Sequence, residues 1–360
     1  MPIKKFQILA INPGSTSTKI AFYENEECIV SENLQHSAEE LQPFVRKPMP
    51  AQLDFRLKKI KSFCDQNQID LNECTAIVGR GGLLQPLKSG TYQVNARMLA
   101  DLHAAKRGEH ASNLGAMLAG KLVHGTTALA CIVDPVSVDE LQPVARLSGL
   151  QGMDRECLSH ALNTKAIAKR FAKETEKDYA ALRLIVAHLG SGISISAHEK
   201  GRMIDVTNPR DEGAFSPERA GSVPVMPLVE LCFSGQFTQK EIVDKLFKEG
   251  GLYSYCGTKD IRQLMALRNE NDTLAALVFD AMVYQISKEI GAMASVLSGE
   301  VDAILLTGGM AKSAEIVTGI RERTAWIAPV SVFAGEEELQ ALTEGALRVL
   351  RREEPILEYV

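Results

Sequence analysis

Three short runs rich in apolar and β-branched residues open the chain, and polar turns separate them. The runs cover 6–11, 18–23 and 28–34, with a hydroxyl-rich stretch at the first break and acidic residues at the second. Runs of this length with turn residues between them are typical of strands joined by short loops. We therefore expect a three-stranded meander at the start of the chain.

Apolar residues recur at helical spacing after this meander. Helices are predicted at 51–67 and 96–123, and the short apolar runs at 74–79 and 129–134 are typical of buried strands. Helices that alternate with buried strands indicate an α/β arrangement, in which helices cover a sheet. We assign residues 1–155 to a first domain of this class.

The plan of the opening segment recurs about 176 residues later, so that Gly14 and Gly190 occupy matching places. After a predicted helix at 156–177, residues 183–206 again combine an apolar strand, Gly-Ser, an alternating strand, a charged turn and another strand. A single duplication of this size differs from a solenoid, whose repeats are roughly 20–50 residues long. It predicts a second, similar domain over residues 156–339.

The last third of the chain is predicted to be mostly helical. The helices cover the segments 226–249, 258–270, 272–299 and 336–352. Acids open the final helix and arginines close it, which suits the helix dipole. We expect the last segment, about 340–360, to pack back on the first domain.

Composition narrows the class of protein. A length of 360 residues fits two domains, and 45% hydrophobic with 24% charged residues fits a soluble globular chain. The net charge of −5 provides no global basic field for nucleic acid, and no apolar run is long enough for a membrane span. The basic clusters at 56–61 and 348–352 are interpreted as solvated helix faces.

The cysteines and the N-terminus indicate a cytoplasmic protein. The seven cysteines form no CxxC pair, and no Cys/His/Asp cluster has tight metal-ligand spacing. This argues against a zinc ribbon or a disulfide framework and favours a reducing compartment. The opening residues lack the apolar segment and the cleavage site of a signal peptide.

The first loop, from Asn12 to Lys19, resembles a phosphate-binding loop in its residue types. A Walker loop or a Rossmann loop would run into a helix, whereas a strand follows here. The backbone N–H groups of a tight turn, the hydroxyls of Ser15 and Ser17, and the Lys19 ammonium can all bind phosphate. The alternative is an ordinary polar turn, which the second hairpin at 188–194 disfavours.

Two other strand ends suggest binding functions. Gly308 and Gly309 follow an apolar run, and adjacent glycines let a flat ligand such as a nucleoside lie against the backbone. The alternative for this pair is a tight strand-to-helix connection. Arg80 stands between glycines that can leave room for a ligand, and Leu83 and Leu84 follow it. A cation beside an apolar wall suits a carboxylate with an alkyl tail, although a simple loop arginine is the alternative.

Three further residues are candidates for catalysis. Asp134 ends a buried strand, where a carboxylate is well placed for Mg²⁺. His188 immediately precedes the second glycine hairpin and can donate to a transition state. Arg219 lies in the long polar segment 208–225, and its planar fork donates in pairs to oxyanions. A surface ion pair is the default for an arginine here, and Arg210 is the weaker candidate.

Five motifs carry a resemblance to a known family: INPGSTSTKIA, VGRGG, AHLGSGISIS, DEGAFSPERAGSVP and LTGGMAKS. They are collinear and span nearly the whole chain. Together they resemble the acetokinase family of acyl kinases, within the sugar kinase/Hsp70/actin superfamily. The resemblance implies two duplicated ribonuclease H-like domains with mixed sheets and an interdomain cleft. It also implies reversible, ATP-dependent phosphorylation of a short-chain carboxylic acid to an acyl phosphate.

The resemblance also assigns roles to residues. The matches to nucleotide- and phosphate-binding positions are Asn12, Ser15, Ser17, Lys19, Gly190, Ser191, Gly192, Gly308, Gly309 and Lys312. The matches to catalytic positions are Arg80, Asp134, His188 and Arg219, with Asp134 linked to magnesium. The expected cofactors are ATP/ADP and Mg²⁺, and the expected assembly is a homodimer or a higher homo-oligomer. Neither nucleic acid nor membrane is an expected partner.

The chain departs from acetate kinases at three places. Their HRVVHGG becomes VGRGG, so Arg80 aligns with a histidine or with an arginine, and Ser191 replaces their usual asparagine. Lys312 replaces a glutamate that helps to hold magnesium, so the metal is expected on Asp134 and water or on another glutamate such as Glu336. These departures favour the branch that phosphorylates butyrate or a branched analogue. Acetate or propionate is the alternative substrate, and an ATP-switched binding protein like actin or Hsp70 is the alternative class.

Overall fold

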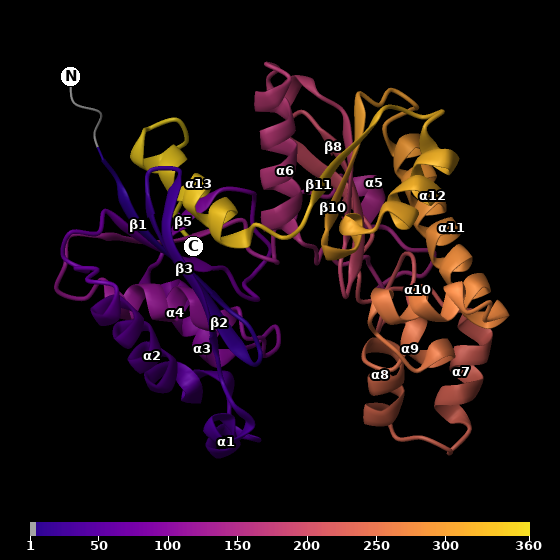
Figure 1. Ribbon diagram of the computed structural model, residues 1–360, viewed down its shortest axis with the longest axis horizontal. Coiled ribbons are helices and arrows are strands. Elements are labelled where there is room, and N and C mark those ends of the chain that lie inside the picture. Colours follow the sequence, from indigo (N-terminus) through magenta and orange to yellow (C-terminus); the bar gives the residue numbers. More distant parts are fainter. Residues whose placement is uncertain (1–4) are drawn as a thin grey trace. The chain divides into compact units, whose positions relative to one another are not determined.

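Two mixed sheets organise the chain (Figure 1), which is described here by a computed structural model covering residues 5–360. The chain divides into two units: unit 1 is Met1–Asp139 with Glu337–Val360, and unit 2 is Glu140–Glu336. The sequence had placed the corresponding boundaries at 155 and 339. The last helix belongs to unit 1.

Unit 1 contains the predicted meander. Its sheet has the order β3-β2-β1-β4-β6-β5. The strands are β1 (Gln7–Pro13), β2 (Ser17–Glu24), β3 (Glu27–Gln35), β4 (Ala76–Arg80), β5 (Thr91–Gln93) and β6 (Leu129–Val133). The first three strands pair antiparallel, whereas β1, β4 and β6 are parallel to one another. The carboxyl ends of these parallel strands therefore meet at one edge of the sheet, where open α/β sheets bind ligands.

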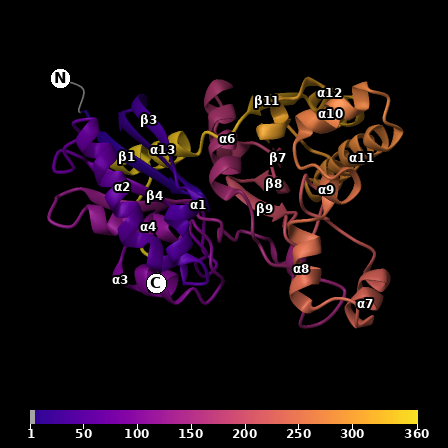
Figure 2. The same cartoon turned by 60° about the horizontal axis from the view of Figure 1, so that its bottom comes forward.

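Helices cover both faces of this sheet. The helices of unit 1 are α1 (Ala38–Leu41), which buries no residue, and α2 (Leu53–Gln66), α3 (Ala96–Ala104), α4 (Asn113–Leu122) and α13 (Glu338–Leu350). On one face α4 packs on the central strands, with α2 and α3 against it (Figure 2). On the other face α13 packs on the same strands (Figure 1). The central strands are thus buried on both sides, which explains their continuous apolar runs.

Unit 2 repeats this plan. Its sheet has the order β11-β10-β7-β8-β9, with β7, β8 and β9 antiparallel and β7, β10 and β11 parallel. The strands are β7 (Leu184–Leu189), β8 (Ile193–Glu199), β9 (Arg202–Val206), β10 (Ala303–Gly308) and β11 (Val330–Ala334). Both meanders even carry a register shift between their second and third strands. The predicted duplication, and with it the two-domain mixed-sheet fold class, is confirmed.

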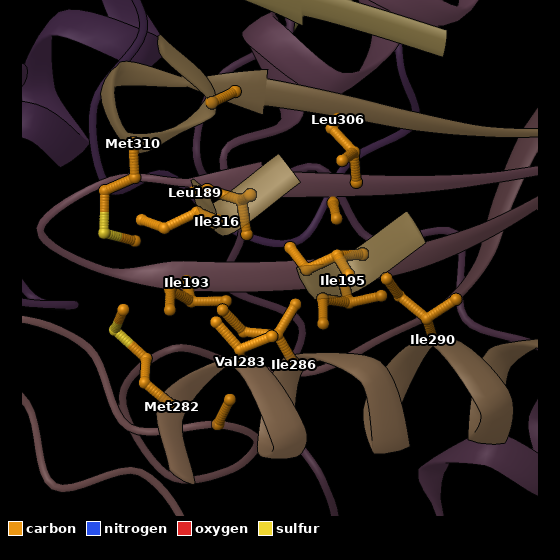
Figure 3. Close-up of a cluster of buried hydrophobic side chains, with 14 of the residues drawn as sticks. Leu189, Ile193, Ile195, Met282, Val283, Ile286, Ile290, Leu306, Met310 and Ile316 are labelled. Atoms are coloured by element: carbon orange, nitrogen blue, oxygen red, sulfur yellow. The ribbon is translucent and has the colours of Figure 1, made fainter. Parts of the chain in front are cut away.

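Helices α11 and α6 bury the two faces of the sheet of unit 2 separately. The helices of this unit are α5 (Pro143–Arg146), α6 (Ala161–Glu174), α7 (Val225–Phe233), α8 (Gln239–Phe247), α9 (Gly251–Cys256), α10 (Ile261–Asn269), α11 (Thr273–Val296) and α12 (Ala314–Thr324). Ile193 and Ile195 of β8 face Val283 and Ile286 of α11 (Figure 3). On the opposite face Leu184 and its neighbours pack on α6.

Two predicted helices are wrong in length. The segment 96–123 forms α3 and α4 with a loop between them, because Ala105 adopts a left-handed conformation that ends the first helix. The segment 226–249 forms α7 and α8, separated by Gly235 at positive φ and by a capping box that starts α8 at Thr238. Among the described residues, no helix is both long and apolar enough to cross a membrane.

Candidate active site

The first hairpin places its polar residues at the sheet edge of unit 1. The tight turn between β1 and β2 is closed by a hydrogen bond from the Gly14 N–H to the Ser17 carbonyl (2.8 Å). Ser15 is exposed at the tip, and Lys19 lies opposite Asn12 in the antiparallel ladder. The loop therefore presents hydroxyls, backbone N–H groups and an ammonium, the chemistry expected of a phosphate-binding turn.

A residue that the sequence did not single out connects Asn12 and Arg80. The Glu338 carboxylate, at the start of α13, accepts a hydrogen bond from the Asn12 side-chain amide and forms an ion pair with the Arg80 guanidinium. Its side chain is only 10% exposed. The acid run at 336–338 looked like a helix start, and only the packing of α13 on β1 and β4 brings this carboxylate to the site.

Asp134 directly follows β6, at the same edge as Asn12 and Arg80. Its carboxylate Oδ1 accepts hydrogen bonds from the Ser89 hydroxyl (2.6 Å) and the Gly90 N–H (2.7 Å), and its backbone has a φ of 37°. Such a conformation is uncommon for a residue other than glycine, and outliers of this kind cluster at functional sites. The geometry fits the predicted role of a fixed, buried carboxylate.

The environment of Arg80 differs from the expected one. A Cβ on Gly81 would collide with Pro135, and one on Gly82 with the backbone of Asn113. These glycines therefore permit close packing of the chain, rather than leaving room for a ligand as we had expected. Leu84 lies in the core of unit 1, so it is not available as an open apolar wall.

The second hairpin gathers a histidine and an arginine in unit 2. A Cβ on Gly190 would lie 2.9 Å from His188 Nε2, and a Cβ on Gly192 would lie 2.8 Å from a guanidinium nitrogen of Arg219. The absence of a Cβ at both positions thus leaves space that the ends of these two side chains approach. Glu336, after β11, brings its carboxylate within 3.3 Å of His188 Nε2.

The ring of His188 is held by a hydrogen bond at its edge and by a second ring stacked on its face. Its Nδ1 is hydrogen-bonded to the Asn163 side chain at 2.8 Å, and His160 stacks on it with ring centroids 3.8 Å apart. His160 is in turn bonded to the Ser194 hydroxyl. Asn163 was not predicted, because a helical asparagine in the sequence gives no sign that it faces a strand end. The hydrogen bond fixes the ring so that Nε2 points toward the hairpin.

Arg219 reaches the hairpin from the long polar loop. The Ser216 hydroxyl donates to the Ser191 carbonyl (2.5 Å) and accepts from the Arg219 N–H, which anchors the arginine beside the turn. Burial lowers the pKa of the Arg219 guanidinium, and Glu218 opposes this effect. By contrast, Arg210 is exposed, with a loose ion pair to Asp211 at 3.8 Å. The expectation of a surface ion pair holds for Arg210 alone.

A pocket of about 1070 Å³ in unit 2 adjoins this hairpin. Gly190, Ser191, Gly309 and Lys312 are part of its lining, and Ile261, Met265 and Met310 contribute apolar side chains. Charged side chains, among them Glu218, Lys259, Asp260, Arg262, Glu315 and Glu336, complete most of the remainder. Gly309 has open space where a Cβ would be, so its backbone is accessible from the pocket. Gly308 instead packs against the backbone of Leu189 at positive φ, which is the tight strand connection of the alternative reading.

The structure thus groups the candidates within each unit. Unit 1 brings together Asn12, Arg80 and Glu338, with the hairpin and Asp134 at the same sheet edge. Unit 2 brings together His188, the glycine hairpin and Arg219. Within residues 5–360 no group of three acidic, histidine or cysteine side chains converges on a metal position.

Comparison with known proteins finds one matching family and several solved structures of similar fold. Residues 154–330 match the model of the acetokinase family. A solved acetate kinase from Porphyromonas gingivalis is 18% identical with a TM-score of 0.78, and the match covers 95% of this chain and 99% of that one. A propionate kinase from Francisella tularensis subsp. tularensis SCHU S4 is 20% identical with a TM-score of 0.74, covering 94% of this chain and 98% of that one.

An acetate kinase from Entamoeba histolytica is 16% identical with a TM-score of 0.76, covering 95% of this chain and 99% of that one. At these identities the structural matches establish the fold, and the family match covers the part of the chain that carries the second hairpin and Arg219. Residues 154–330 are therefore similar to the acetokinase family, and the chain has the two-domain fold of the solved acetate and propionate kinases.

Proposed function

We propose that this protein is an acyl kinase, which transfers the γ-phosphoryl group of ATP to a short-chain carboxylic acid and forms an acyl phosphate and ADP reversibly. The observation that carries the proposal is the convergence of His188 and Arg219 on the glycine hairpin of unit 2. Two side-chain donors beside a Gly-Ser-Gly turn are suited to a phosphoryl group. The acetokinase-family match over the same residues supports this reading.

The adjoining pocket is the proposed nucleoside site. Its apolar side chains suit a flat base, and the accessible backbone at Gly309 suits close contact with the ring or ribose. Lys312 lines the same pocket and can pair with phosphate oxygens. In unit 1 the hairpin from Asn12 to Lys19 is the proposed site for further phosphate groups.

For the acceptor we propose butyrate or a branched analogue, which makes the protein a butyrate kinase. The departures at Arg80, Ser191 and Lys312 from the acetate kinase motifs support this choice. Acetate and propionate are the second candidates, because solved acetate and propionate kinases share the fold over nearly the whole chain.

Magnesium fits the oxygen groups at the sheet edge of unit 1. Asp134 and Glu338 supply two buried carboxylates and Asn12 an amide oxygen, a set that suits a cation which takes one or two carboxylates plus water and phosphate. We propose these three residues as its ligands, with Glu338 in the role that the sequence had left to another glutamate. When bound, the metal would neutralise charge on the β- and γ-phosphates.

In the proposed reaction the substrate carboxylate is the nucleophile, and it is ionised at neutral pH, so no general base is required. One carboxylate oxygen bonds to the γ-phosphorus while the bond to the β,γ-bridging oxygen breaks, and ADP keeps that electron pair. Arg219 and His188 donate to the phosphoryl oxygens as the charge is redistributed. Arg80, held by Glu338, is the proposed partner of the substrate carboxylate.

The test is hydroxylamine trapping of the acyl phosphate with ATP and a series of acids from acetate to hexanoate, including isobutyrate. We expect the highest kcat/KM for butyrate or isobutyrate. A maximum at acetate or propionate would keep the acyl kinase and reject the butyrate assignment. If no acid forms hydroxamate or stimulates ADP release, the acyl kinase reading fails and an ATP-switched binding protein becomes the better explanation.

The seven cysteines are free thiols. This is consistent with the cytoplasmic location that we propose, since reducing compartments keep thiols unpaired.

A further inference from the structure

The phosphate hairpin of unit 1 rests on a buried arginine. We had interpreted the basic cluster at 56–61 as a solvated face, but Arg56 of α2 is fully buried. Its guanidinium donates to the Ser17 carbonyl (2.9 Å), the Thr18 hydroxyl (2.9 Å) and the Ser15 carbonyl (3.3 Å). The Gln52 side-chain oxygen accepts two more of its hydrogen bonds.

Three carbonyl groups of the turn, those of Ser15, Thr16 and Ser17, are bound on this inner side. Arg56 binds those of Ser15 and Ser17, and the His36 N–H donates to that of Thr16 (2.9 Å). The backbone N–H groups of Ser15 and Thr16, by contrast, donate to no acceptor among residues 5–360. The carbonyls therefore point inward and these donors remain available to a ligand.

In the second hairpin a turn carbonyl is also bound by a side chain from another segment, but the donor is a hydroxyl rather than a guanidinium. Ser191 occupies the place that Ser15 has in the first hairpin, and its carbonyl accepts a hydrogen bond from the Ser216 hydroxyl. In both hairpins the corresponding carbonyl is therefore bound by a side chain from another segment. A positively charged group fills this role only in the first hairpin.

We propose that Arg56 is a positioning residue for phosphate binding: it holds the carbonyls of Ser15 and Ser17 away from the ligand and thereby orients the N–H of Thr16, which shares a peptide group with the Ser15 carbonyl, toward it. The inference rests on the proposed function for the identity of the ligand, the terminal phosphates of ATP. Binding a carbonyl to a cation also polarises the peptide group, which strengthens its N–H as a donor.

A guanidinium suits this position better than an ammonium. The planar fork reaches two carbonyls and a hydroxyl at once, whereas lysine would present a single nitrogen. Thr18 and Gln52 accept its remaining protons, so the burial of the charge is compensated by hydrogen bonds. His36, which contacts the Thr18 hydroxyl, has its pKa lowered to about 4 by burial and by Arg56, so no second charge is present at neutral pH.

The test compares the binding of ATP and AMP, which share the nucleoside and differ in the terminal phosphates. In calorimetric titrations of the full chain, Arg56→Met should weaken ATP binding by about tenfold or more, because charge-assisted hydrogen bonds that orient the donors are lost. Affinity for AMP should stay within about twofold, because Arg56 is not among the residues that line the nucleoside pocket. A loss of stability alone would leave the ratio of the two affinities unchanged.

Lys58→Met is the matched control, because it removes one positive charge from an exposed position of the same helix. It should leave both affinities unchanged. If Arg56→Met does not fold, Arg56→Lys carries the test: it keeps the charge and loses the fork, so ATP affinity should fall by about threefold to tenfold. A wild-type ratio of ATP to AMP affinity in the folded Arg56 variant would overturn the inference.

The two proposals fail separately. If the wild-type protein forms acyl phosphate and the Arg56 variant keeps its ATP preference, only the role of Arg56 is wrong. If no acid is phosphorylated but the variant still loses ATP affinity selectively, the acyl kinase is wrong and the positioning role stands.

Discussion

At the scale of single residues, the candidate site depends on side chains whose partners come from distant parts of the chain. Glu338 holds Asn12 and Arg80, and Asn163 holds His188. These contacts fix the direction of each functional group before a ligand arrives. Preorganised donors of this kind usually provide the largest single contribution to transition-state stabilisation.

Arg219→Ala tests the proposed phosphoryl donor. We expect kcat for acyl phosphate formation to fall by ~10²–10³, with a much smaller rise in the KM for ATP, because the guanidinium acts on charge that moves during transfer. Steady-state kinetics with the preferred acid measure both. Arg210→Ala, which removes an exposed arginine from the same loop, should behave like wild type. A near-normal kcat in the Arg219 variant would contradict the proposal that Arg219 donates to the phosphoryl group in the transition state.

Glu338→Gln tests the carboxylate that the sequence did not reveal. The amide keeps the shape but removes the charge that pairs with Arg80, so we expect kcat to fall about 10–100-fold and the Mg²⁺ concentration for half-maximal activity to rise. A magnesium titration of the rate measures both effects. The neighbouring Glu337→Gln, at an exposed position, is the control. An unchanged magnesium requirement would remove Glu338 from the metal site.

At the scale of elements, each hairpin is supported by a neighbouring segment rather than by its own strands. Arg56 of α2 and the residue that follows β3, His36, bind the inner side of the first turn. The loop before α7 supports the second turn through Ser216. Removing the contacts of the first turn should therefore lower the free energy of unfolding of unit 1. Removing those of the second turn should lower that of unit 2.

The folding stability of unit 1 should depend on the protonation of His36. Its pKa is lowered from 6.5 to about 4 in the folded state, because the ring is buried and lies near Arg56 and Lys59. Below pH 6.5 the unfolded chain binds the proton and the folded chain does not, so stability falls as the pH decreases from 6.5 to 4. One such group contributes up to about 3 kcal/mol over this window.

Urea unfolding between pH 4 and pH 7 measures how the free energy of unfolding depends on pH. In the transition of unit 1, His36→Asn should weaken this dependence. His198 in unit 2 also has a pKa lowered by burial, so its variant serves as the comparison for the other unit. An unchanged slope in the His36 variant would show that this ring is not responsible.

At the scale of the whole molecule, helix α7 is unusual because its apolar side chains are exposed to solvent. Every residue of α7 is at least partly exposed, although its sequence, VMPLVELCF, is almost entirely apolar. Val225, Met226 and Phe233 are each more than 60% exposed. Such a patch marks an interaction surface on a soluble protein.

We predict that α7 lies in the interface of a homodimer, the assembly implied by the family resemblance. Phe233→Glu should give monomers in sedimentation equilibrium at concentrations where the wild-type protein is dimeric, because a charge in an apolar interface is not compensated. Trp326→Glu changes a similarly exposed aromatic residue outside α7 and is the control. A wild-type monomer, or a dimeric Phe233 variant, would contradict the prediction.

Much of the fold was predictable because its signals are local or periodic. The alternation in β2 and β8 and the glycine turns before them indicated the two meanders, and their recurrence indicated the duplication. Helix ends were predictable only in part, since the left-handed Ala105 has no distinctive local pattern. The acetokinase-family resemblance was supported over residues 154–330, whereas the acyl chain preference stays a prediction.

The sequence by itself determined the fold class, the two hairpins and the chemical types of residue that they carry, because these follow from apolar periodicity and turn composition. Only the tertiary structure decided which side chains support them. Arg56 looked like part of a surface charge run, and Glu338 like an ordinary helix start, since burial and long-range pairing leave no mark on neighbouring residues. The glycines beside Arg80 looked open to a ligand, but the helix and loop packed against them fill that space.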